Sequence, residues 1–193
     1  MTRSLSRDML RVNPASDPLN GWRIDDAREL YRIPQWSKGF FDVNEAGHLT
    51  AHPYRNQWSI DLKALVDQLA VRDIHPPLLV RFTDILRQRL MDIADAFQTA
   101  MVEQGYRGGY NCVYPIKVNQ MRHVVEEIVH YGVDQGFGLE AGSKPELLAI
   151  LALAGDRDIP MICNGFKDAE FIEMVILAQK LGKRVIPVVE KWS

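Results

Sequence analysis

The sequence of 193 residues has only two cysteines and no long apolar run. These two features argue against a disulfide-rich protein and against a membrane-spanning one. Cys112 and Cys163 each lie in or beside a segment predicted to be a buried strand, which favours packed, reduced thiols over a disulfide framework or a metal site. No segment approaches the roughly 20 apolar residues that a membrane-spanning helix needs. Residues 1–8 also lack the apolar core of a signal peptide. We therefore expect a cytoplasmic protein without a membrane partner.

An excess of charge of one sign is also missing. The 23 basic and 25 acidic residues are mixed along the chain, the formal net charge is −2, and no basic stripe would follow a phosphate backbone. A nucleic acid partner is therefore not expected. A G-x-G-x-x-G nucleotide loop is absent, and none of the five histidines is spaced with metal-ligand partners. His123 and His130 lie seven residues apart on an expected outer helix, which favours a pair facing solvent.

The chain changes character at Pro76-Pro77. Residues 1–75 mix aromatic residues with turn-forming pairs and lack sustained helical periodicity, so we interpret them as an irregular or β-rich N-terminal extension. In residues 76–193 an apolar strand alternates with an amphipathic helix, which predicts an α/β fold of about five βα units. Thr83 or Asp84, Ser143 and Asp168 are the expected helix caps. The predicted strands are Leu78–Phe82, Val113–Val118, Phe137–Gly142, Pro160–Asn164 and Val185–Glu190.

Lys117 lies inside the apolar run Val113–Val118, where a charged side chain is unusual. A buried amine tends to lose its proton, and a neutral amine on a rigid strand is what a Schiff base with a carbonyl cofactor requires. The alternative is an edge-strand lysine that reaches solvent along its stem. From Lys117 to Glu140, Asn164 and Glu190 the steps are 23, 24 and 26 residues. Each strand thus delivers a polar side chain near its carboxyl end, where a βα barrel keeps its active site.

Three ordered motifs carry a family resemblance: YPIKVNQ at 114–120, GLEAGSKPEL at 138–147 and CNGFKD at 163–168. They resemble the PLP-dependent arginine decarboxylases of the biosynthetic type, in the alanine-racemase-like group of barrel decarboxylases. The N-terminal extension is also similar to that family, whereas the shorter relatives that act on ornithine or diaminopimelate lack its aromatic block. The resemblance implies a PLP-binding TIM-type (β/α)8 barrel of which this chain holds the N-terminal part.

The resemblance also implies a chemistry. Lys117 would bind PLP covalently, and L-arginine would lose CO2 to give agmatine in polyamine biosynthesis, with the cofactor ring as electron sink. Glu140 matches an acidic residue near the cofactor lysine of the ornithine enzymes, so it is a cofactor-binding candidate; alternatively it bonds a neighbouring loop. Asn119 and Asn164 either order the barrel mouth or form turns. Some members of the family depend on Mg²⁺, but no metal site is visible in the sequence.

A complete barrel needs eight βα units and about 250 residues. The resemblance therefore implies a truncated fragment with little or no activity of its own, because the phosphate loop and most substrate contacts lie farther along in the family. It further implies a homo-oligomer with shared active sites. Two alternatives stay open: a decarboxylase of ornithine, lysine or diaminopimelate, and a non-catalytic PLP-binding or regulatory chain. We also expect the first and last predicted strands to be unpaired edges.

Overall fold

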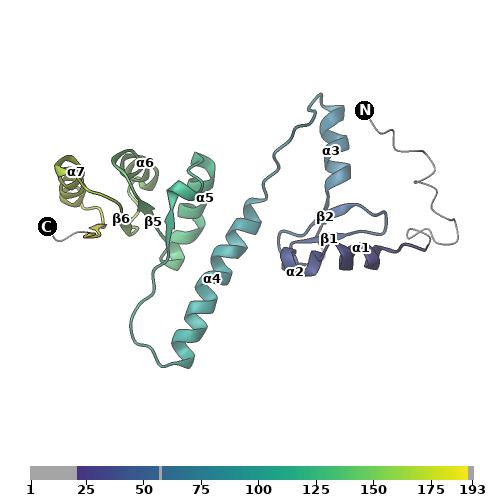
Figure 1. Cartoon of the computed structure of the whole chain (residues 1–193), viewed down its shortest axis with the longest axis horizontal. Coiled ribbons are helices and arrows are strands. Elements are labelled where there is room, and N and C mark those ends of the chain that lie inside the picture. Colours follow the sequence, from purple (N-terminus) through teal and green to yellow (C-terminus); the bar gives the residue numbers. More distant parts are fainter. Residues whose placement is uncertain (1–20, 57, 191–193) are drawn as a thin grey trace, which may run out of the picture. The chain divides into compact units, whose positions relative to one another are not determined.

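The structure, a computed structural model, describes residues 21–56 and 58–190, which form two compact units divided between Val80 and Arg81. Each unit has a sheet of its own, antiparallel in the first and parallel in the second (Figure 1). Within the described ranges, no helix has both the length and the apolar character needed to cross a membrane.

The N-terminal unit combines a small sheet with three helices. The region was predicted to be irregular or β-rich; the structure shows a small sheet there, but the helices hold more of its described residues than the strands do. A hairpin joins the first two strands through Ala46-Gly47, where Gly47 adopts a φ of +79° that glycine accepts without strain. The elements are α1 (Ile24–Leu30), α2 (Ile33–Ser37), β1 (Phe41–Val43), β2 (Leu49–Ala51), β3 (Ile60–Asp61) and α3 (Leu62–Val71), with strand order β1-β2-β3.

Asp61 ties the hairpin to the start of α3. One carboxylate oxygen accepts a hydrogen bond from the Ala64 N–H at 3.0 Å and so caps the helix. The other accepts from Asn44 Nδ2 at 2.8 Å and lies 2.8 Å from His48 Nδ1. These hydrogen bonds, that from Ala64 first, lower the pKa of Asp61 to about 2.

We expect the N-terminal unit to lose stability as the pH falls from about 4 to about 2. The folded-state pKa of Asp61 lies below its ordinary value of 3.8, so the contribution is complete above that value and is lost as the pH falls through the folded pKa. Urea midpoints from tryptophan fluorescence should report it, because Trp22, Trp36 and Trp58 lie in this unit. The Asp61→Asn variant should show a flatter pH profile; a profile identical to the parent's would contradict the assignment.

The C-terminal unit is a four-stranded parallel sheet with helices between the strands. Its strand order is β4-β5-β6-β7, so each strand lies beside its neighbour in the chain. This order is that of a barrel and differs from the reversing order of an open doubly wound sheet. The elements are α4 (Thr83–Glu103), β4 (Val113–Pro115), η3 (Ile116–Val118), α5 (Arg122–Gly132), η4 (Val133–Gln135), β5 (Gly138–Ala141), α6 (Lys144–Ala154), β6 (Met161–Cys163), α7 (Ala169–Lys180) and β7 (Val185–Pro187).

One face of the parallel sheet is buried and the other is open. Leu139, Met161 and Val185 lie in register on adjacent strands, and each is at most 2% exposed. They belong to a core with apolar residues of α5, α6 and α7, three helices that lie side by side along the sheet (Figure 1). Because side chains alternate along a strand, the next register row, which includes Glu140 and the half-exposed Ile186, faces the other way. This arrangement confirms the predicted α/β class and the partial barrel.

One predicted strand is absent, and two others end well earlier than predicted. Residues 78–82 form no strand: Leu79 is 73% exposed, and no strand of the described residues pairs with this segment to satisfy its backbone groups. Strand β4 ends at Pro115 instead of continuing to Val118, because the chain turns into a 3-10 helix at Ile116. Strand β7 ends at Pro187 instead of Glu190, although the Val188 N–H still donates to the Cys163 carbonyl at 2.9 Å. The edge strands of the sheet are therefore β4 and β7. The expectation of an unpaired edge is confirmed for the last predicted strand and is wrong for the first, which does not form.

The predicted helix caps are partly confirmed. Asp168 Oδ1 accepts from the Phe171 N–H at 2.9 Å, and Ser143 Oγ accepts from the Glu146 N–H at 3.4 Å. At α4 the prediction is wrong, because Phe82 occupies the N-cap and the helix has no side-chain cap. The Glu146 carboxylate also departs from a standard capping box, since it accepts from the Gly142 N–H at 2.6 Å rather than from the N-cap residue.

Candidate functional site at the carboxyl ends of the parallel strands

Lys117 lies just beyond the carboxyl end of β4, in the short turn η3. It is exposed, whereas Ile116 beside it is 1% exposed and packs into the core. The prediction of a lysine buried within a strand is therefore wrong, because Pro115 ends the strand two residues earlier. Among the described residues, Lys117 Nζ makes no hydrogen bond or ion pair. Its amine is thus open to a ligand that approaches from solvent.

Glu140 lies on the adjacent strand, at the same end of the sheet. It is paired in register with Pro115, and the turn that carries Lys117 contacts β5. Glu140 is half-buried, and no hydrogen bond or ion pair joins its carboxylate to another residue of the described ranges. The alternative that this carboxylate bonds a neighbouring loop therefore does not describe the structure.

The other strand-end residues have structural partners. Asn119 Oδ1 accepts from the Met121 N–H at 3.1 Å and its carbonyl accepts from the Tyr114 hydroxyl at 3.2 Å, so it shapes the turn before α5. The Asn164 N–H donates to the Ala141 carbonyl at 2.8 Å and so extends the ladder between β5 and β6. The Glu190 carboxylate accepts from the Gly165 N–H.

Two residues of this edge were not singled out by the sequence patterns. Lys144 Nζ lies 2.9 Å from Asp168 Oδ2 and also contacts the Glu170 carboxylate, which joins the starts of α6 and α7. Gly165 has a φ of +78°, and a Cβ there would lie 2.6 Å from the Gly142 carbonyl oxygen. The signal for the first was present, because Lys144 and Asp168 are 24 residues apart, the same step as from Glu140 to Asn164.

The two histidines of α5 are exposed, and the two cysteines are packed. His123 and His130 are exposed on α5, as predicted. Within the described ranges no three histidine, cysteine or acidic side chains are grouped to hold a metal ion. Cys163 is buried in the core and Cys112 is half-buried, so both pack as predicted. Burial raises the pKa of the Cys163 thiol to about 11, which leaves it unreactive at neutral pH.

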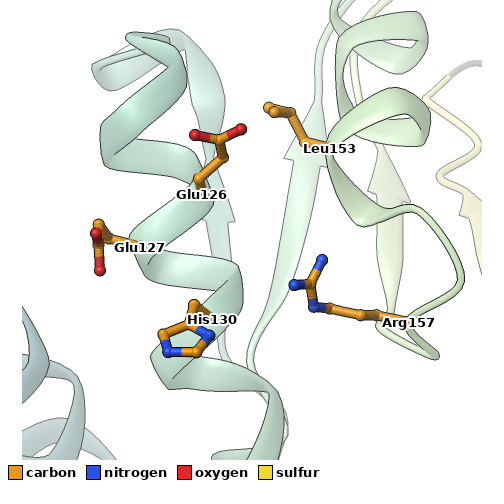
Figure 2. Close-up of a pocket in the computed structure, with 5 residues that line it drawn as sticks. All are labelled: Glu126, Glu127, His130, Leu153 and Arg157. Carbon is orange, nitrogen blue, oxygen red and sulfur yellow. The ribbon is translucent and has the colours of Figure 1, made fainter.

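A concavity lies on the outer helical layer, between α5 and α6. It measures about 280 Å³ and is lined by Glu126, Glu127, His130, Leu153 and Arg157 (Figure 2). Figure 2 shows Glu126, Glu127 and His130 along one helix and Arg157 across the gap. Glu126 is already paired with Arg122 at 2.7 Å. This groove belongs to the helical surface, whereas the unpartnered lysine and carboxylate lie at the strand ends.

Comparison with known proteins identifies relatives of both units. Residues 90–189 match the family model of the pyridoxal-dependent decarboxylases, pyridoxal binding domain. The chain is 51% identical over 172 residues to the biosynthetic arginine decarboxylase of Phocaeicola vulgatus, and 50% identical over 173 residues to that of Rhodopirellula baltica. Each match covers 89% of this chain, but only 27% and 26% of those proteins. The chain therefore spans about a quarter of the length of these relatives.

A solved structure agrees with this. The crystal structure of the biosynthetic arginine decarboxylase SpeA of Campylobacter jejuni superposes with a TM-score of 0.76 at 34% identity, over 83% of this chain and 27% of that one. Members of the matched family bind pyridoxal phosphate. The described residues fit that cofactor, because an exposed, unpartnered amine in the turn after β4 and an unpartnered carboxylate on β5 lie at the same carboxyl end of the sheet. With a family match over more than half of its residues and this edge inside the matched region, the chain belongs to the pyridoxal-dependent decarboxylases.

Proposed function

We propose that this chain contributes the cofactor lysine to an arginine decarboxylase, which converts L-arginine to agmatine and CO2. The observation that carries the proposal is the free amine of Lys117 in the turn after β4, with Glu140 on the adjacent strand at the same carboxyl end of a barrel-type sheet. The choice of arginine is supported by relatives that bear this name and are about half identical to the chain. Those matches are longer than the family match and include residues of the N-terminal unit.

The cofactor, when bound, supplies an electron sink for the negative charge left on the substrate Cα as CO2 departs. Lys117 Nζ would bond covalently to the cofactor's carbonyl carbon and so hold it at the strand ends. Glu140, on the adjacent strand, would place a negative charge at the same end of the sheet and so favour the protonated forms of groups near it. Because Lys117 is exposed, its amine would reach the cofactor without rearrangement of the core.

The same proposal assigns a part of the enzyme to each region of the chain. Residues 1–75 would form an extension typical of the arginine branch, and residues 76–193 the first part of the cofactor-binding barrel. A complete barrel has eight βα units, and the described residues contain four parallel strands. We therefore propose that this polypeptide by itself has little or no decarboxylase activity, and that the complete enzyme is a homo-oligomer.

The direct test is chemical labelling of the lysine. The chain is incubated with PLP, reduced with borohydride and digested, and the pyridoxyl mass is located by peptide mapping. We expect the label to concentrate on the peptide that contains Lys117, and to disappear in Lys117→Ala. Lys180→Ala is the matched control, because Lys180 is also exposed and unpartnered but lies at the far end of α7. Labels scattered over surface lysines, with none favoured, would overturn the proposal.

A further inference from the structure

We propose that Lys144 is a positioning residue for the cofactor site, because it locks the loop after β5, which follows Glu140, to the loop after β6. This inference rests on the proposed function and adds a residue that the family match does not assign. Its basis is one juxtaposition: an ammonium group at the start of α6 lies between two carboxylates at the start of α7.

Asp168 is the centre of this contact, because its two oxygens hold different elements. Oδ1 accepts from the Phe171 N–H at 2.9 Å and caps α7, while Oδ2 lies 2.9 Å from Lys144 Nζ. Lys144 also contacts the carboxylate of Glu170, which lies in the first turn of the same helix. The starts of α6 and α7 are therefore held together by a lysine whose side chain is 32% exposed.

The two loops also touch through their backbones, on the strand side of the same junction. The Asn164 N–H donates to the Ala141 carbonyl at 2.8 Å. Gly165 approaches the Gly142 carbonyl so closely that a Cβ would lie 2.6 Å from it. The peptide that follows Glu140 is thus held by backbone contacts at one end and by the Lys144 ion pairs at the other. The proposal requires that a shift of the α6 start be passed along residues 141–143 to Glu140.

The ion pairs of Lys144 are expected to fix the positions of the two loops more than to raise the free energy of unfolding. The carboxylates of Glu170 and then Asp168 raise the pKa of Lys144, and Lys144 lowers that of Asp168. Both partners are solvated, and solvated ion pairs contribute little to the free energy of unfolding. What the cluster fixes is the relative position of two loops at the carboxyl edge of the sheet. Displacements of about 1 Å at such a place can reduce reactivity by about 100-fold.

The test compares PLP labelling of Lys117 in the parent chain, Lys144→Ala, Lys144→Arg and the control Lys180→Ala. The PLP concentration that gives half-maximal labelling should rise about tenfold in Lys144→Ala. Arginine reaches the same carboxylates with two donors, so Lys144→Arg should stay within about threefold of the parent. Thermal midpoints of all four proteins should differ by only a few degrees, as expected for a solvated ion pair.

The outcomes separate this inference from the proposed function. Equal labelling of Lys117 in the parent and in Lys144→Ala would overturn the positioning role and leave the function intact. Equal losses in Lys144→Ala and Lys144→Arg, accompanied by a lower thermal midpoint, would also overturn it, in favour of a general structural effect. A parent chain without label on Lys117 would overturn the proposed function, and the positioning role with it.

Discussion

Replacement of Gly138 by alanine is expected to lower the free energy of unfolding of the C-terminal unit by about 3 kcal/mol or more. Gly138 begins β5, and a Cβ there would lie 2.0 Å from the Pro160 carbonyl oxygen and 2.5 Å from Pro160 Cγ. That carbonyl is already fixed, because it accepts from the Leu139 N–H at 2.9 Å. A methyl group can be admitted only by separating β5 from the segment that leads into β6.

The expected loss is a large share of the 5–15 kcal/mol that stabilises an ordinary domain. Urea denaturation followed by circular dichroism would measure it. Gly109→Ala is the matched control, since Gly109 lies in the same unit with no atom within 4 Å of the added methyl group and without a positive φ. A Gly138→Ala midpoint equal to that of Gly109→Ala would show that the two strands can separate freely at this point.

A chimera should reveal the second large effect. Residues 21–190 of this chain would replace the corresponding segment of the Phocaeicola vulgatus arginine decarboxylase, to which the chain is 51% identical. Cores tolerate many simultaneous apolar replacements when volume and pattern are kept, so we expect the chimera to fold and to release CO2 from arginine. Lys117→Ala in that chimera should reduce kcat by at least about 100-fold, because the amine that binds the cofactor is removed.

Two controls are needed to interpret the kcat of the Lys117→Ala chimera. Lys180→Ala in the chimera should leave kcat unchanged, because this lysine lies at the opposite end of α7 from the strand ends. Circular dichroism should show that the parent chimera and both variants are folded. A folded Lys117→Ala chimera that keeps its kcat would show that Lys117 is not the cofactor lysine.

Local signals in the sequence predicted the starts of α6 and α7 and the alternation of strands and helices that gives the parallel sheet. Ser143 and Asp168 cap their helices through side-chain oxygens that reach backbone N–H groups three residues on, which depends on nearby residues alone. The strand at residues 78–82 failed because a strand needs a partner, and apolar composition does not supply one. Propensity alone describes a segment, whereas a sheet depends on pairs of segments.

The sequence motif proposed Lys117 as the cofactor lysine but did not predict the environment of its side chain. The motif around Lys117 indicated the residue, yet its burial was mispredicted because Pro115 ends the strand and the following turn buries Ile116 instead. The Lys144 contacts depend on two βα units being in register, so no single motif contains them. They become visible only when the 24-residue step between units is applied to charged residues as well as to strand ends.

The sequential strand order has a consequence for how this sheet is assembled. Every pairing in β4-β5-β6-β7 joins segments that are one βα unit apart, so no contact between strands requires the closure of a long loop. The sheet can therefore grow one unit at a time, as repeat proteins do, with each new strand adding to an edge that is already formed. A destabilised unit should then weaken the strands on either side of it first.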